Sequence, residues 1–202
     1  MNSRQVSHAE CLRTRIKICG LTTVEEASQV AQCGADSIGL VFHQQSPRFV
    51  ELSVAAEIRQ SLAPFVSVTA LFLNESDSWI DSVMQHVQPD CLQFHGTESV
   101  DFCEHWDIAY IKAIPMGSTV DANEYAEGFK TAQGFLMDSN VAGRQGGSGD
   151  TFDWSKIPVN FRSPLILAGG LTPNNVAEAV SKTRPWAVDV SSGVESKNPQ
   201  NT

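Results

Sequence analysis

The stretch RIKICGLTTVEEASQVAQCGADSIGLVF, residues 15–42, contains the pattern that decides the fold. Apolar and polar residues alternate over 15–19, which predicts a short strand. The amphipathic run over 24–35 predicts a helix, and the run over 36–42 predicts a second strand. Strands that are separated by a helix pair in parallel through a right-handed crossover. The stretch is therefore one strand–helix–strand unit.

The same alternation recurs along the whole chain. Further strands are predicted at 65–73, 90–95, 108–114, 134–138, 164–169 and 186–190, and further helices at 53–62, 76–87, 98–106, 122–129 and 173–183. A doubly wound open sheet and a closed (β/α)8 TIM barrel both fit this order. Eight strands in 202 residues, with polar or glycine-rich residues at their C-terminal ends, favour the barrel. An open sheet would place a glycine-rich fingerprint after its first strand, and GLTT (20–23) is not one.

Two helix starts are indicated by single residues. Thr23 is the expected N-cap of the first helix, with Glu26 three residues later completing a capping box. Pro173 suits the first turn of the last helix, because proline there loses no hydrogen bond.

The two ends of the chain differ from the repeating part. Residues 1–14 lack the apolar segment of a secretory signal, and we expect a disordered extension there. We predict one barrel domain over 15–202, in which the sequence after the eighth strand, 191–202, provides no eighth helix. That helix normally covers the seam between the last and first strands. We therefore expect a marginally stable chain, or one that buries the seam against another subunit.

Composition is typical of a soluble globular protein, with 42% apolar and 18% charged residues. A net charge of −9 argues against a nucleic-acid-binding face, and no apolar run approaches the ~18 residues of a membrane span. Five cysteines without a CxxC pair fit reduced thiols in the cytoplasm. We expect a cytoplasmic protein without nucleic-acid or membrane partners.

One group of possible metal ligands stands in the middle of the chain, at Cys91, His95, Cys103 and His105. The predicted elements place two of them on a strand and its loop and two on the following helix. This is not the paired-ligand spacing of a zinc site, and we predict no metal.

Glycines are concentrated in the loops after the sixth, seventh and eighth strands. They are Gly146, Gly147, Gly149, Gly169, Gly170 and Gly193. Residues without a Cβ let backbone N–H groups approach an anion, and TIM barrels commonly bind phosphate in the loops after their last two strands. Ordinary tight turns would explain one glycine pair, but they explain three neighbouring glycine-rich loops poorly. The sequence therefore predicts a phosphate site.

Cys19 and Asp138 end the first and sixth strands, which lie across the lumen of a closed barrel. Asp138 shares its face with Leu136, and an apolar environment would raise its pKa and let it act as a general acid. A thiol has an ordinary pKa of about 8.5 and acts as a base once its thiolate is stabilised. A small buried cysteine and a capping or salt-bridge aspartate are the structural alternatives. Together, the two residues favour proton transfer on a phosphorylated small molecule.

Arg48 follows the second strand, and its fork of donors suits a planar carboxylate. A solvated surface arginine is the alternative interpretation of this residue.

Seven motifs resemble, in order and spacing, those of the phosphoribosylanthranilate isomerases of tryptophan biosynthesis. They are KICGLT (17–22), SPRFV (46–50), LQFHG (92–96), FLMDS (135–139), GGSGDTFDW (146–154), LAGGLTPNNV (167–176) and VDVSSGVE (188–195). The resemblance covers about residues 15–195. Other phosphate-binding barrels share the glycines, but not KICG together with GGSGxTFDW.

The resemblance implies a cofactor-free Amadori rearrangement of N-(5-phosphoribosyl)anthranilate to 1-(2-carboxyphenylamino)-1-deoxyribulose 5-phosphate. Asp138 would protonate the furanose ring oxygen and open the ring to a Schiff base. Cys19 would then remove the proton from C2 of the sugar, giving an enolamine that tautomerises to the ketone. Arg48 would face the anthranilate carboxylate. Separately, we expect the protein to be a monomer or a homodimer.

The remaining substrate contacts follow from the same resemblance. Phosphate would be held by backbone amides around Gly147, Ser148, Gly149, Gly169, Gly170, Ser192 and Gly193, and the substrate wall would include Gln93 and His95. The alternatives are a related isomerase or lyase, a dual-substrate aminoaldose isomerase that also serves histidine synthesis, or a truncated, inactive phosphate-binding barrel or interaction module. The sequence offers no second phosphate-binding set, which weakens the dual-substrate alternative.

Overall fold

Eight parallel strands form a closed barrel in the computed structural model, which describes residues 13–139 and 152–195. The strands are β1 (Arg15–Cys19), β2 (Ser37–Val41), β3 (Ser67–Phe72), β4 (Cys91–Phe94), β5 (Tyr110–Pro115), β6 (Gly134–Asp138), β7 (Leu165–Leu167) and β8 (Ala187–Val190). Each strand pairs with its neighbour in sequence, and β8 pairs with β1 to close the ring. The predicted barrel is confirmed, and the open sheet is excluded.

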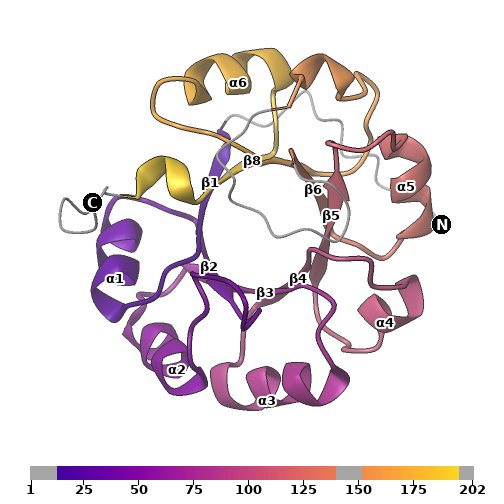
Figure 1. The fold of residues 1–202 in the computed structure, drawn as a ribbon. Coiled ribbons are helices and arrows are strands. Elements are labelled where there is room, and N and C mark those ends of the chain that lie inside the picture. Colours follow the sequence, from indigo (N-terminus) through magenta and orange to yellow (C-terminus); the bar gives the residue numbers. More distant parts are fainter. Residues whose placement is uncertain (1–12, 140–151, 196–202) are drawn as a thin grey trace.

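Six α-helices of the described residues surround the barrel (Figure 1). They are α1 (Val24–Gln32), α2 (Leu52–Ser61), α3 (Asp77–Val87), α4 (Val100–Glu104), α5 (Ala122–Gly128) and α6 (Val176–Thr183), with 3-10 turns η2 (Trp154–Lys156) and η3 (Ser192–Val194). Within the described part of the chain, which ends at residue 195, β8 is followed by η3 and by no α-helix. The extension expected over residues 1–14 lies outside the described residues except for its last two positions.

Backbone conformation makes several elements shorter than the sequence predicts. Phe65 has a φ of 74° and is fully exposed, so the predicted strand over 65–73 begins only at Ser67. Gly169 has a φ of 83°, which ends β7 before it, and Gly34 with a φ of 94° ends the first helical segment. A left-handed residue cannot continue a strand or a helix.

The two predicted helix starts have different outcomes. The Thr23 hydroxyl accepts from the N–H of Glu26 at 3.2 Å, as expected of an N-cap. The Glu26 carboxylate accepts from the N–H of Thr22 at 3.0 Å, so the capping box closes one residue earlier than predicted. The prediction for Pro173 is wrong, because α6 begins at Val176 after a separate turn.

The strands separate an outer core from the barrel lumen. Outward-facing residues of β2, β3 and β4, such as Leu40, Phe72 and Phe94, pack with α1 to α4 in the largest apolar cluster. A second apolar cluster lies among β5 to β8 and includes Leu136 and Ile166. Buried polar side chains also occur in the sheet, and they are Lys17, Thr69, Gln93, Lys112, Asp138 and Asp189. Among the described residues, no helix has the length and hydrophobicity needed to cross a bilayer.

Candidate active site

A cavity of about 780 Å³, including its open mouth, lies at the C-terminal ends of the strands. Nine residues that the sequence predicts as functional line it, and they are Cys19, Arg48, Gln93, His95, Asp138, Gly169, Gly170, Ser192 and Gly193. The other predicted residues, Gly147, Ser148 and Gly149, lie outside the described residues.

Cys19 is the last residue of β1, and its side chain is buried at the cavity. Its partner in the neighbouring strand β2 is Gly39. A Cβ at Gly39 would stand 2.5 Å from the Cys19 sulfur, which is far inside contact distance. The missing side chain at position 39 therefore makes the room that the thiol occupies.

Burial raises the pKa of the Cys19 thiol to about 11. Lys17 and Arg48 act in the opposite direction, while the Asp189 carboxylate adds to the rise. Lys17 and Asp189 form a buried ion pair at 2.9 Å between Nζ and Oδ1. Cys19 is therefore predominantly a neutral thiol in the ligand-free site at neutral pH, and it can act as a base only when its thiolate is stabilised.

Asp138 ends β6 and contacts two polar side chains. Its Oδ1 accepts from the Ser139 hydroxyl at 3.2 Å, and its Oδ2 lies 3.2 Å from Nε2 of His95. Nε2 of Gln93 lies 3.1 Å from Nδ1 of His95. If Gln93 donates to Nδ1, the hydrogen-bond network assigns the ring proton to Nε2, which then donates to Asp138. His95, predicted as part of the substrate wall, therefore also orients the carboxyl group.

One polar atom of the Gln93 side chain is buried without a hydrogen-bond partner among the described residues. The side chain is fully buried and lines the cavity, and the unpartnered atom is its Oε1. A buried acceptor without a partner is unfavourable by ~1–3 kcal/mol. A bound molecule with a hydroxyl group would satisfy it.

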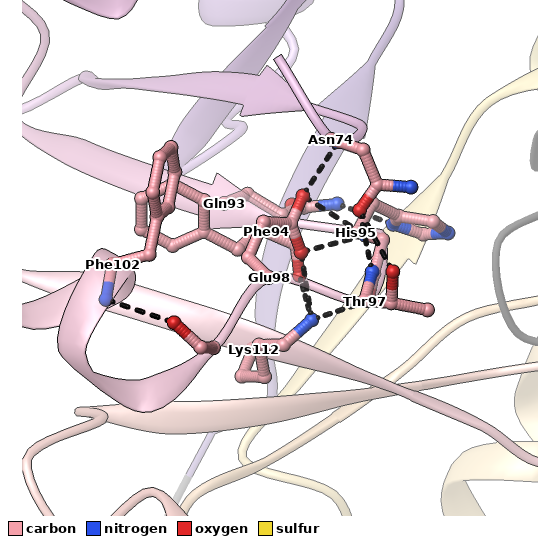
Figure 2. A network of polar contacts seen from close by, with 10 residues as sticks. Asn74, Gln93, Phe94, His95, Thr97, Glu98, Phe102 and Lys112 are labelled. Atoms are coloured by element: carbon pink, nitrogen blue, oxygen red, sulfur yellow. Dashed lines mark hydrogen bonds and ion pairs between the residues drawn. The ribbon is translucent and has the colours of Figure 1, made fainter. Parts of the chain in front are cut away.

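A buried ion pair fixes the loop that carries His95 (Figure 2). Nζ of Lys112 on β5 donates to Glu98 Oε2 at 3.0 Å and to the Gly96 carbonyl at 2.6 Å. The Glu98 carboxylate in turn accepts from the backbone N–H groups of Gly96, at 3.0 Å, and Asn74, at 2.8 Å. Both side chains are almost completely inaccessible, with exposed fractions of 0% and 2%.

Asn74 extends this network to the next loop residue. Its Oδ1 accepts from the backbone N–H of Thr97 at 2.7 Å and from the Thr97 hydroxyl at 3.1 Å. Figure 2 shows these contacts beside His95, so the loop after β3 and the loop after β4 are held together behind the cavity. Sequence reasoning missed Lys112 and Glu98. A lysine inside the apolar strand IAYIKAI (108–114) was the available signal.

The loops after β7 and β8 approach each other so closely that only glycine fits. Gly169 and Gly170 have φ values of 83° and 61°, and a Cβ at Gly169 would stand 2.7 Å from the Ser139 backbone nitrogen. A Cβ at Gly193 would overlap with the carbonyl oxygen of Leu171. Backbone from three consecutive strand ends therefore meets on one side of the cavity.

Two hydrogen bonds of the Asn175 side chain stabilise the turn between β7 and α6. Its Nδ2 donates to the carbonyl of Gly170 at 2.9 Å, and its Oδ1 accepts from the N–H of Thr172 at 2.8 Å. The backbone of this glycine loop is thus fixed without any ligand.

Arg48 holds a carboxylate of the protein itself. Its Nε and Nη2 donate to the two oxygens of Glu195 at 2.6 and 3.1 Å. The aliphatic part of Arg48 crosses Gly20, which has a φ of 90° and no room for a Cβ. The guanidinium at the cavity therefore already pairs in a bidentate manner with a planar carboxylate.

The cavity also contains residues that the sequence did not single out as functional. They include Val41, His43, Leu71, Leu73, Ser139, Ala168, Leu171 and Val190. Apolar residues of β2 and β3 form a wall near Arg48, opposite the glycine loops in strand order. His43 contacts Glu75 at 2.7 Å. Among the described residues, no three metal-ligating side chains come together, and this includes Cys91, His95, Cys103 and His105.

Residues 16–201 match the family model of the N-(5'-phosphoribosyl)anthranilate isomerases. The chain belongs to this family. The isomerase of Alcanivorax borkumensis is 50% identical over 186 residues, which span 92% of this chain and 85% of the relative. That of Nitrosococcus oceani is 48% identical over 184 residues, with 91% and 89% covered. The match extends the resemblance that the motifs indicate to nearly the whole chain.

Solved isomerase structures have the same fold. The enzyme of Thermus thermophilus superimposes with a TM-score of 0.80 at 32% identity, covering 92% of this chain and 90% of that chain. A phosphoribosylanthranilate isomerase in complex with reduced 1-(o-carboxyphenylamino)-1-deoxyribulose 5-phosphate has a TM-score of 0.77 at 37% identity, with 91% and 90% covered. The enzyme of Thermotoga maritima is described as dimeric.

The raised pKa of Cys19 predicts a steep pH dependence of its alkylation in the ligand-free isomerase. Only the thiolate reacts with iodoacetamide, so the rate is expected to rise about tenfold per pH unit until it levels off near pH 11. Mass spectrometry of the peptide that contains Cys19 measures the rate, and the exposed Cys33 provides an internal reference. A rate that levels off below pH 9 would contradict the burial argument.

Replacing Lys112 by Met is expected to lower the free energy of unfolding by about 3–5 kcal/mol, because Glu98 would be left buried and unpaired. The matched control is Lys182→Met, which breaks the exposed Glu178–Lys182 pair on α6 and should lower it by less than about 0.5 kcal/mol. Urea unfolding monitored by circular dichroism measures both. Equal small effects would show that the buried pair does not hold the loop.

Proposed function

We propose that Cys19 and Asp138 perform the acid–base chemistry by which this family member converts N-(5'-phosphoribosyl)anthranilate to 1-(2-carboxyphenylamino)-1-deoxyribulose 5-phosphate. The observation that supports these roles is their position. They end β1 and β6 of one closed barrel, and both line the same cavity. A base and an acid on different strands can act on two atoms of one sugar.

Asp138 acts first, as the general acid. It gives a proton to the furanose ring oxygen while the bond from that oxygen to C1 breaks. The nitrogen lone pair of the anthranilate forms a C=N bond, so the open-chain product is a protonated Schiff base. His95 and Ser139, each 3.2 Å from the carboxylate, keep it oriented toward the substrate.

Cys19 acts second, as the general base. Its thiolate takes the proton from C2, the electrons of the C–H bond form the C1=C2 double bond, and the C=N electron pair returns to nitrogen. The resulting enolamine becomes the ketone when the C2 hydroxyl loses its proton and C1 gains one. Because burial raises the pKa of Cys19 to about 11, only a small fraction of the free enzyme carries the thiolate at neutral pH.

Substrate orientation follows from the asymmetry of the cavity. Arg48 would bind the anthranilate carboxylate in the place that Glu195 takes in the ligand-free structure. The substrate phosphate would lie at the opposite side, against the backbone of Gly169, Gly170 and Gly193. The unpartnered Oε1 of Gln93 would accept a hydrogen bond from a sugar hydroxyl between them. No specific observation favours a dual-substrate isomerase, another isomerase or lyase, or an inactive barrel.

Removing either group is expected to abolish most of the activity. Positioned acids and bases contribute ~10²–10⁴-fold, so Cys19→Ala and Asp138→Asn should each lower kcat/KM by about that factor. The assay is product formation from N-(5'-phosphoribosyl)anthranilate, together with complementation of a tryptophan auxotroph that lacks this step. Circular dichroism controls for folding. Growth that is unaffected by both substitutions would show that the roles are wrong.

Glu195→Gln is expected to lower the KM about two- to fivefold, because the substrate carboxylate no longer competes with a charged carboxylate for Arg48. The range corresponds to the ~0.5–1 kcal/mol of a half-exposed ion pair, and the Glu195 side chain is 50% exposed. Glu178→Gln, at an exposed pair on α6, is the control and should leave the KM unchanged. An increase in KM would instead show that Glu195 positions Arg48 for the substrate.

The cellular location and the oligomeric state of the protein stay predictions. We propose a cytoplasmic enzyme that is a monomer or a homodimer. In a homodimer, the face beside Ile16 of β1, which is 38% exposed, would be the surface to examine.

A further inference from the structure

The lumen of the barrel contains one cation directly behind the active-site thiol. Lys17 precedes Cys19 by two residues on β1, so both side chains point to the same face of the sheet. The side chain of Lys17 is 6% exposed, its ammonium group hydrogen-bonds Asp189, and its charge acts on the nearby Cys19 thiol. No step of the proposed reaction has yet used this residue.

Strand pairing fixes the position of this cation. Lys17 and Asp189 are register partners in the β1–β8 ladder, and the distance from Nζ to Oδ1 is 2.9 Å. Burial by itself would lower the pKa of Lys17, but Asp189 and Cys19 beside it raise it. The group is therefore an ammonium ion across the whole physiological pH range.

A purely structural explanation of this ion pair is weak. Removing two charges from water offsets most of their attraction, and apolar residues of similar volume usually stabilise a buried position equally well or better. The neighbouring cluster among β5 to β8, with Leu136 and Ile166, shows that the same sheet packs well without charges. A lysine that is retained beside a reactive sulfur points to a chemical role.

We propose that Lys17 is a positioning residue for Cys19, held in place by Asp189, whose ammonium group stabilises the thiolate that removes the C2 proton. The inference rests on the proposed role of Cys19 as the general base. A buried thiolate without a nearby cation would be an uncompensated charge in the lumen, and Lys17 supplies the opposite charge from the same strand and the same face of the sheet.

Other charged groups that face this site come from four further elements, and they are Asp189 on β8, Arg48 after β2, His95 after β4 and Asp138 on β6. Arg48 favours the thiolate and Asp189 opposes it. Arg48 is already paired with Glu195 and would pair with the substrate carboxylate in its place, so a carboxylate offsets its effect on the sulfur in both states. Lys17 cannot be reached in this way, because it lies behind Cys19 in the barrel, so its contribution persists in the enzyme–substrate complex.

The experiment compares Asp189→Asn, which keeps the buried Lys17 ammonium, with the double variant Lys17→Met/Asp189→Asn, which contains neither charge of the ion pair, so that the two proteins differ only at position 17. The alkylation rate of Cys19 against pH is the readout, because it depends on thiol acidity and not on turnover. In Asp189→Asn, the midpoint should fall, since the carboxylate that opposes the thiolate is gone. In the double variant, it should lie at least one pH unit higher than in Asp189→Asn, the shift expected of a unit charge within hydrogen-bond range.

Two further variants separate this effect from general damage. Lys17→Arg keeps the charge and should restore most of the acidity of Cys19 that Lys17→Met removes. Lys112→Met removes the other fully buried lysine, which pairs with Glu98, and should leave the Cys19 midpoint unchanged. Equal midpoints in Asp189→Asn and the double variant would overturn the proposal for Lys17. Full activity of Cys19→Ala would instead overturn the proposed function, whatever the alkylation experiment gives.

Discussion

The pairing of β1 with β8 is the constraint on which the rest of the molecule depends. It closes the sheet, and closure is what brings Cys19 and Asp138, which are more than a hundred residues apart in sequence, to one cavity. The Lys17–Asp189 ion pair lies within this ladder. The pairing of the first and last strands therefore also places a positive and a negative charge near the thiol. A shift of one residue in the β1–β8 register would turn Lys17 and Cys19 out of the lumen.

Burial has two opposite effects at this site. Excluding water around Cys19 strengthens every electrostatic interaction there, but it also raises the pKa of the thiol that we propose as the base. Two cations near the sulfur, Lys17 behind it and Arg48 at the mouth of the cavity, lower the pKa of the thiol and so oppose the effect of burial. Asp138, the proposed general acid, is also buried, and its carboxylate lies against His95.

Sequence patterns predicted the features that depend on local alternation. The eight strands, the closed barrel and the positions of nine cavity residues follow from strand ends and glycine-rich loops. Contacts between distant side chains could not be predicted in this way. Lys112 with Glu98, and Arg48 with Glu195, meet only after the barrel has formed. The start of α6 was wrong for a related reason, because Asn175 hydrogen-bonds back to Gly170 and keeps the preceding residues in a turn.

Glycines inside this barrel are informative because of the atoms that they leave out. Gly39 lies within β2, where glycine weakens a strand and often marks a close approach of other groups. The group that approaches is the Cys19 sulfur, which occupies the space of the absent Cβ. Gly169 and Gly193 do the same for backbone at the ends of β7 and β8. The cavity is therefore shaped by missing side chains as well as by those that line it, and even alanine at position 39 would displace the sulfur that the proposed chemistry needs.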